Sequence, residues 1–211
     1  TKVRNEIYDD NIYFVQEKFD QQQSTQVFNA ISHAVSKYIK NIVTHDTINI
    51  NKLVSELHQK LGENIQLMLD YIPELSLIIH KKYTLSQLEP SKAHSRFNIT
   101  FLKFMQIMSR YSKKLILVID DMQWCDLATI NLIELMINND DLENISFVLA
   151  YRNNEVKSNH PFSVMLSKFM KSENYIRLEL LPLERSDIVL LLEDTFGMKN
   201  VDINEFAQIL K

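Results

Sequence analysis

Two adjacent carboxylates follow five apolar residues in the segment LILVIDDMQWCD, residues 115–126. Carboxylate oxygens are ligands for Mg²⁺, and a carboxylate can also orient or deprotonate a water molecule. Asp120 and Asp121 are therefore the first candidates for chemistry in this chain. A structural interpretation competes with this one, because aspartate is common where a strand ends in a turn and hydrogen-bonds its own backbone.

The apolar run indicates how the two acids are positioned. Its continuity predicts a strand over residues 115–120 that is covered on both faces, as in the middle of an α/β sheet. Ligands of such sheets bind beyond the carboxyl ends of the strands. In P-loop nucleotide hydrolases an acid at this end holds Mg²⁺, so the pattern predicts a Walker B motif. Asp120 would then serve the metal, and Asp121 would be the catalytic carboxylate that acts on water.

Along the chain, hydrophobic patterns typical of strands alternate with patterns typical of helices. A 3.6-residue period predicts helices, and short apolar runs between turn residues predict strands. This rhythm implies parallel pairing with right-handed crossovers, and hence a three-layer α/β/α sandwich. The expected strands are residues 12–15, 115–120, 145–151 and 175–180, and the expected helices are residues 1–9, 24–40, 49–61, 63–71, 92–111 and 184–195.

Several further motifs carry a resemblance to a known family. The segment DDMQWCD is similar to DDLQWAD, FVLAYRNNEV to GAYRDNEV, and EKFDQ to GKFDQ, while His160-Pro161-Phe162 and Arg96-Phe97 match an HP-hydrophobic step and an RF pair. Together they resemble the ATPase region of large multidomain sensor kinases, a P-loop NTPase of the AAA or STAND type with an Orc1-like AAA domain. Those proteins join a protein-kinase-like domain, this ATPase, a GAF sensor and a histidine kinase.

The resemblance implies ATP and Mg²⁺ as cofactors and adds three site residues. Arg152 would sense the γ-phosphate, although it could instead cap the sheet edge or pair with Glu155. Pro182 would begin a lid and touch the adenine, although it could equally be an ordinary break between a strand and a helix. Thr1 would take the place of the Mg²⁺-binding Ser or Thr.

The phosphate loop itself is missing. Gly62 and Gly197 are the two glycines, so no G-x-x-x-x-G-K-[ST] loop exists here, and the chain starts at Thr1. Aligned on the family, the chain begins one residue past the P-loop lysine. We therefore expect a fragment, with an NTPase core at residues 1–181 that lacks its central first strand, and the start of a helical lid at residues 182–211. A sheet without that strand would be unstable and prone to aggregate.

Other residues near the acids favour structural roles. Asp126 precedes a helical pattern and predicts an N-cap, and Trp124 predicts packing under the acids. A stripe of aromatic and methionine residues from Phe97 to Met108 predicts core packing. Cys125 is expected to be inert filler. For Glu17 and Lys18 a contact with nucleotide or with a partner stays open.

Composition narrows the function class. The net charge of −4 gives no basic footprint for nucleic acid, and no apolar stretch reaches the length of a membrane span. One cysteine excludes a disulfide framework and suits a reducing, cytoplasmic compartment. The six histidines lack metal-ligand spacing, so zinc is not expected.

These observations predict a signalling switch that binds and slowly hydrolyses ATP. Its partners would be the kinase, GAF and histidine-kinase modules of the parent chain, with self-association possible. A receiver domain is excluded because it needs a phosphoacceptor aspartate about 40 to 50 residues beyond the acid pair, and no aspartate occurs between Asp141 and Asp187. A catalytically degenerate NTPase fold that serves as an interaction scaffold stays as the alternative.

Overall fold

The computed structural model describes residues 12–21, 27–45, 49–86, 89–111, 114–142 and 144–196. The chain divides into two compact units, Thr1–Phe169 and Met170–Lys211. The helix expected over residues 1–9 lies outside the described residues. The domain boundary expected between residues 181 and 182 stays a prediction.

A parallel sheet carries the candidate acids in the first unit. Its three described strands are β1 (Ile12–Lys18), β2 (Lys114–Asp120) and β3 (Ile145–Leu149), in the order β1-β2-β3. Both pairs are parallel, and Lys18 lies opposite Asp120 while Ile119 lies opposite Leu149. All three carboxyl ends therefore meet at one edge of the sheet. This arrangement confirms the predicted parallel α/β class.

The central strand is buried mainly on one face. Leu115, Leu117 and Ile119 are each at most 1% exposed, whereas Ile116 and Val118 are half-buried. Helix α2 (Asn29–His45) covers the buried face, where the rings of Tyr13 and Tyr38 meet edge to face at 5.6 Å. The expectation that both faces of β2 are fully covered is not met among the described residues.

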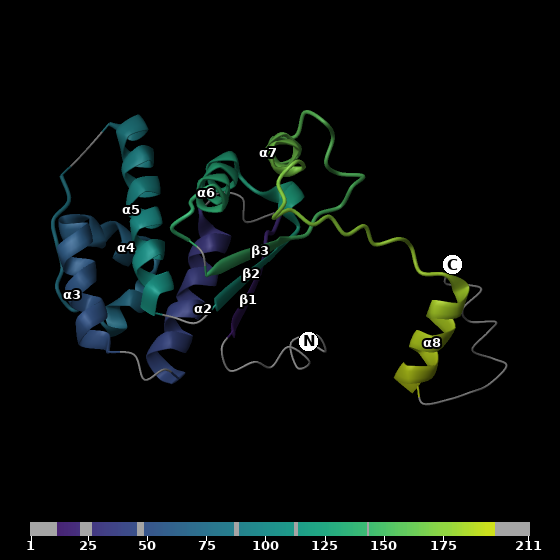
Figure 1. The fold of residues 1–211 in the computed structure, drawn as a ribbon, viewed down its shortest axis with the longest axis horizontal. Coiled ribbons are helices and arrows are strands. Elements are labelled where there is room, and N and C mark those ends of the chain that lie inside the picture. Colours follow the sequence, from purple (N-terminus) through teal and green to yellow (C-terminus); the bar gives the residue numbers. More distant parts are fainter. Residues whose placement is uncertain are drawn as a thin grey trace. The chain divides into compact units, whose positions relative to one another are not determined.

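The helices follow the predicted pattern with shifted ends (Figure 1). Helix α2 begins five residues later than expected, and the helix expected over residues 63–71 opens with a turn of 3-10 helix. None of the described helices is long and apolar enough to cross a membrane. The remaining helices are α3 (Ile50–Leu61), α4 (Ile65–Tyr71), α5 (Pro90–Tyr111), α6 (Leu127–Ile137), α7 (Pro161–Phe169) and α8 (Arg185–Phe196), with 3-10 turns η1 (Gly62–Asn64), η2 (Pro73–Leu77) and η3 (Met122–Trp124).

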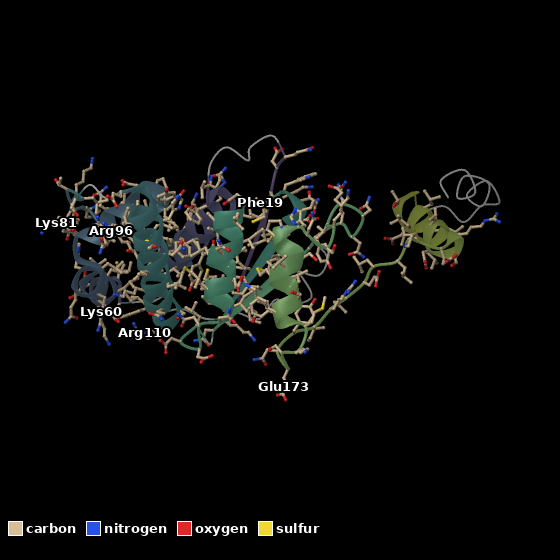
Figure 2. The ribbon with its side chains drawn as sticks, turned by 90° about the horizontal axis from the view of Figure 1, so that it is seen from above. Phe19, Lys60, Lys81, Arg96, Arg110 and Glu173 are labelled. Atoms are coloured by element: carbon tan, nitrogen blue, oxygen red, sulfur yellow. The ribbon has the colours of Figure 1, made fainter. Side chains whose placement is uncertain are left out.

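An aromatic cluster joins the start of α2 to α4 and α5. The rings of Phe28 and Phe97 stack with centroids 4.2 Å apart, and Tyr71 and Phe101 lie against Phe97. The stripe from Phe97 to Met108 is buried, so the predicted core role is confirmed. Side chains fill the space between these helices, whereas those of Lys60 and Lys81 extend outward (Figure 2).

The prediction of a strand at residues 175–180 is wrong. This segment of the second unit has no regular secondary structure, and its alternating apolar side chains are exposed. The exposed fractions are 83% for Ile176, 84% for Leu178 and 94% for Leu180. A strand needs ladder hydrogen bonds to a neighbour, and a period of two in the sequence cannot supply that neighbour.

Asp126 caps α6, as predicted, and also reaches the start of α2. Its Oδ1 accepts the backbone N–H of Thr129 at 2.8 Å, and its Oδ2 accepts the Thr129 hydroxyl. The Thr129 oxygen in turn accepts the backbone N–H of Phe28 at 3.2 Å. Phe28 has φ 66°, a left-handed conformation that is uncommon for a bulky residue. The cap therefore helps to hold a strained turn as well as a helix end.

We expect Asp126→Ala to destabilise the first turn of α6 by about 1 kcal/mol, because it removes the N-cap acceptor. The Phe28 amide should lose protection as well, since Thr129 no longer has the carboxylate to orient it. Hydrogen exchange of the amides at residues 28 and 127–130 measures both effects. Asp126→Asn keeps one oxygen for the cap and is the matched control. Unchanged exchange at Phe28 in Asp126→Ala would show that the two ends are independent.

Candidate functional site

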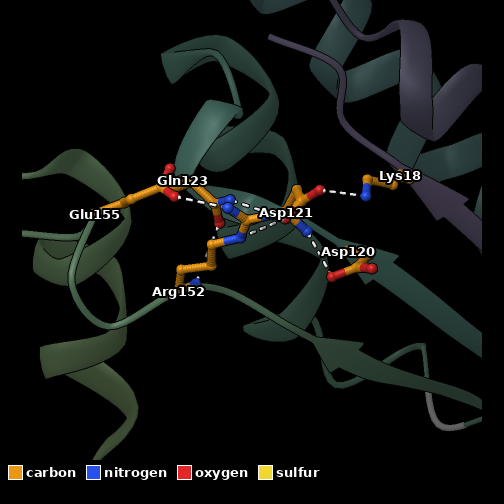
Figure 3. Close-up of polar contacts among 6 residues, drawn as sticks. All are labelled: Lys18, Asp120, Asp121, Gln123, Arg152 and Glu155. Carbon is orange, nitrogen blue, oxygen red and sulfur yellow. Dashed lines mark hydrogen bonds and ion pairs between the residues drawn. The ribbon is translucent and has the colours of Figure 1, made fainter. Parts of the chain in front are cut away.

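The three strand ends bring four charged residues together. Lys18 ends β1, Asp120 ends β2, Asp121 follows it, and Arg152 lies three residues beyond β3 (Figure 3). The strand register predicts this meeting, because parallel strands that end together place their following residues at one edge. Asp120, Asp121 and Arg152 were expected here from sequence, and the structure places them together.

Asp121 is the buried centre of this cluster. Its side chain is 5% exposed, and its backbone is left-handed with φ 55° and ψ 45°. The Lys18 ammonium lies 2.7 Å from Oδ2, and Gln123 Nε2 donates to Oδ1 at 2.8 Å. Arg152 Nε lies 3.7 Å from Oδ1. A buried carboxylate is costly without such partners, so these contacts stabilise the charged form.

The pKa values of the closest pair shift in opposite directions. Contact with the Lys18 ammonium lowers the pKa of Asp121 below 3.8, helped by the Gln123 amide and opposed by burial. The hydrogen bond to Asp121 and its negative charge raise the pKa of Lys18 above 10.5. The stabilisation from Asp121 is therefore lost only as pH falls through its lowered pKa. That from Lys18 is lost only as pH rises through its raised pKa, so both groups are charged near neutrality.

Asp120 differs from its neighbour in exposure and in partners. It is half-buried, and its Oδ1 accepts the backbone N–H of Asp121 at 2.8 Å. Within the described ranges no basic side chain forms an ion pair with it. Asp120 is thus the acid with an oxygen left for a cation, whereas Asp121 is held by protein groups.

Arg152 contacts three groups around the acids. Its Nη1 lies 3.1 Å from Glu155, its guanidinium carbon lies 5.7 Å from the centre of the Trp124 ring, and its backbone N–H donates to Gln123 Oε1 at 3.3 Å. The pairing with Glu155 that was considered from sequence is therefore present. The side chain is still 56% exposed, and its role as a phosphate sensor stays a prediction.

Three of the residues that build this site, Lys18, Gln123 and His160, have no role that the sequence predicts. The sequence leaves open whether Lys18 contacts nucleotide or a partner, and the structure pairs it with Asp121, while Glu17 pairs with Lys37 on α2. Gln123 and His160 lie inside the motifs that carried the resemblance. Gln123 is 7% exposed, and its carbonyl lies 3.1 Å from His160 Nε2. An amide side chain two residues after a pair of acids was the sequence signal that could have identified Gln123.

The remaining candidates lie elsewhere. Thr1 is outside the described residues. Pro182 belongs to the second unit, in exposed irregular chain before α8, and its contact with adenine stays a prediction. Burial and the nearby Asp126 raise the pKa of the Cys125 thiol, which suits the expected inert role. Among described residues no group of three or more His, Cys, Asp and Glu side chains is placed to hold a metal ion.

Comparison with known proteins gives this arrangement a family. A model of the AAA ATPase domain matches residues 1–148. The chain is 29% identical over 126 residues to "Hybrid signal transduction histidine kinase G" of Dictyostelium discoideum. The match covers 60% of this chain and 4% of that protein, so the chain spans a small part of its relative. No solved structure matches. Because the family model covers more than half of the chain, this protein belongs to the AAA ATPase domain family.

Proposed function

We propose that this region binds and slowly hydrolyses ATP as a switch within a signalling protein. The observation that carries the proposal is the meeting of Asp120, Asp121 and Arg152 at the carboxyl ends of parallel strands in a member of the AAA ATPase domain family. Two acids and an arginine at this edge are among the side chains that P-loop enzymes use for phosphoryl transfer to water. The finer roles of these residues are our assignment.

The side chains fit a nucleotide with its metal ion. Asp120 has an oxygen left for the water shell of Mg²⁺. Thr1 would be the second Mg²⁺-binding residue, as the resemblance implies. Bound Mg²⁺ would supply charge neutralisation on the phosphate oxygens. Arg152 can bridge two phosphate oxygens because its guanidinium is planar and carries a fixed charge.

Asp121 would act on the attacking water. A carboxylate whose pKa is lowered is ionised at neutral pH and accepts a hydrogen bond from water, which orients the lone pair of the oxygen. Because Lys18 and Gln123 already bind this carboxylate, its position is fixed before any ligand arrives. The same contacts lower its basicity, which is consistent with slow turnover.

The signalling context is part of the proposal. The relative in Dictyostelium is named a signal transduction histidine kinase, and this chain resembles the ATPase region of sensor kinases. We infer that bound nucleotide clamps the lid predicted to start at Pro182, and that hydrolysis releases it. Kinase, GAF and histidine-kinase modules of a longer polypeptide would respond to that change.

A second function is favoured by one observation. Asp121 is buried and contacts Lys18, Gln123 and Arg152, which is also what a structural anchor would do. In that case the fold would be a degenerate NTPase module that binds partner domains. Nucleotide binding by the full-length gene product separates the two functions.

We expect Asp120→Ala to weaken Mg²⁺-dependent ATP binding by about tenfold or more, because it removes the carboxylate that serves the metal. Titration of the full-length gene product with a fluorescent ATP analogue, with and without Mg²⁺, measures the effect. Binding that is unchanged in Asp120→Ala would remove Asp120 from the metal site. A wild type that binds no nucleotide would favour the scaffold.

Asp121→Asn is expected to keep ATP binding and to lose turnover by about 100-fold, because the amide still accepts from Gln123 but is a poor base. Phosphate release in single-turnover assays measures the loss. The variant also removes the charge that pairs with Lys18, so Lys18→Met is the matched control for the broken ion pair. If Asp121→Asn turned over at the wild-type rate, the acid would be structural.

Arg152→Lys tests the sensor role. The variant keeps a positive charge but cannot bridge two oxygens, so we expect kcat to fall by about tenfold or more with a smaller change in the affinity for ADP. Glu155→Gln releases the competing ion pair and should leave ADP affinity unchanged. Equal losses for ATP and ADP in Arg152→Lys would contradict a role at the γ-phosphate.

A further inference from the structure

Two segments of chain meet at this site and are joined beyond the sheet. The acid turn, residues 120–124, begins at the last residue of β2, and the arginine loop, residues 150–160, follows β3. Main-chain bonds link them where the sheet ends: Ala150 N–H donates to Ile119 O at 2.9 Å, and Met122 N–H donates to Ala150 O at 3.0 Å. From Arg152 onward the described bonds between the two segments run through side chains.

Gln123 makes two of the bonds to the arginine loop and a third bond within the acid turn. Its Nε2 donates to Asp121 Oδ1, its Oε1 accepts the backbone N–H of Arg152, and its carbonyl accepts from His160. The orientation of the amide is fixed by chemistry, because a carboxylate only accepts and a backbone N–H only donates. A rotated amide would place like groups against each other at both ends.

His160 closes the far end of the loop. Its Nδ1 accepts the backbone N–H of Phe162 at 3.2 Å, so the ring proton is on Nε2 and is donated to the Gln123 carbonyl at 3.1 Å. One imidazole therefore caps the start of α7 and fastens the acid turn. Both sides of the ring are used, which fixes its tautomer.

We propose that Gln123 is a positioning residue, fastened by His160, that holds Asp121 and Arg152 in register as one unit. The inference rests on the proposed function, since it assigns Gln123 a part in the same reaction. Water orientation by Asp121 and phosphate sensing by Arg152 would need fixed relative placement, because displacements of about 1 Å are enough to slow catalysis strongly. One amide bonded to both residues provides that placement.

Substitutions at Gln123 separate positioning from binding. Gln123→Met has a similar length and removes both side-chain bonds, and we expect kcat of the full-length gene product to fall by about 30-fold. The dissociation constant of the ATP analogue should change less than about threefold, because Gln123 contacts protein groups. Gln123→Glu keeps an acceptor for the Arg152 N–H and should recover part of the loss, limited by repulsion from Asp121. Lys157→Gln, an exposed position in the same loop, should behave as the wild type.

Substitutions at His160 can remove its contact with Gln123 while keeping its contact with Phe162. Asparagine is a good N-cap, so His160→Asn keeps an acceptor for the Phe162 N–H but is too short to reach the Gln123 carbonyl. We expect kcat to fall by about fivefold to tenfold while amide exchange in α7 stays as in the wild type. His160→Ala removes the cap as well and should also loosen α7.

A double-mutant cycle distinguishes positioning from general loss of stability. If Gln123 acts through Arg152, then Gln123→Met should have a much smaller effect on kcat in an Arg152→Ala background, whereas unrelated structural losses would add. Full additivity, or wild-type kcat in both Gln123→Met and His160→Asn, would overturn the inference and leave the proposed function intact.

The test also works without catalysis. If the wild type shows no turnover, the proposed function fails and no part in a reaction remains for Gln123. Hydrogen exchange then decides whether the link between the two segments exists. Exchange at the Arg152 amide should accelerate by about tenfold in Gln123→Met and in His160→Asn, because each variant removes a bond that holds the loop. Unchanged exchange in both variants would show that the loop does not depend on Gln123.

Discussion

The charge of Asp121 is the constraint on which the site depends. A carboxylate that is 5% exposed must be compensated by the protein, and its partners come from three different segments. Lys18 is supplied by the end of β1, Gln123 by the acid turn and Arg152 by the loop after β3. A shift of any strand by one residue would turn its side chains to the other face and separate this group. The charge compensation of Asp121 therefore depends directly on the register of the sheet.

The acid turn and the start of α6 also form hydrogen bonds to the chain segments that follow β1 and β3. Phe19 N–H donates to Asp120 O at 3.1 Å, and Phe28 N–H donates to Thr129 Oγ1, so the chain between β1 and α2 is held at both described ends. Gln123 holds the loop after β3 in the same way. One short stretch after β2 thus contacts the segments that follow both neighbouring strands. A change at either segment can reach the acids through hydrogen bonds alone.

Local pattern predicted much of this from sequence, since the apolar run, the acid pair and the N-cap at Asp126 are features of neighbouring residues. The meeting of Asp120, Asp121 and Arg152 followed from parallel strands that end together. The partners of Asp121 were harder to predict. Lys18 lies over 100 positions from Asp121 in the chain, and an alternating strand end does not show whether its last side chain pairs with an acid or extends into water. Gln123 was close in sequence, but its contact with Arg152 depends on the path of a loop.

The segment at residues 175–180 shows the limit of periodicity in physical terms. Its alternation of Ile176, Leu178 and Leu180 with charged residues matches a half-buried strand, yet these side chains are more than 80% exposed. Alternation records which face would be buried, whereas a strand forms only if a neighbouring strand accepts its hydrogen bonds. β2 has such neighbours on both sides and is a strand as predicted. An apolar pattern in the sequence therefore becomes a strand only where a neighbouring strand is present at the right edge, and no local sequence feature encodes that neighbour.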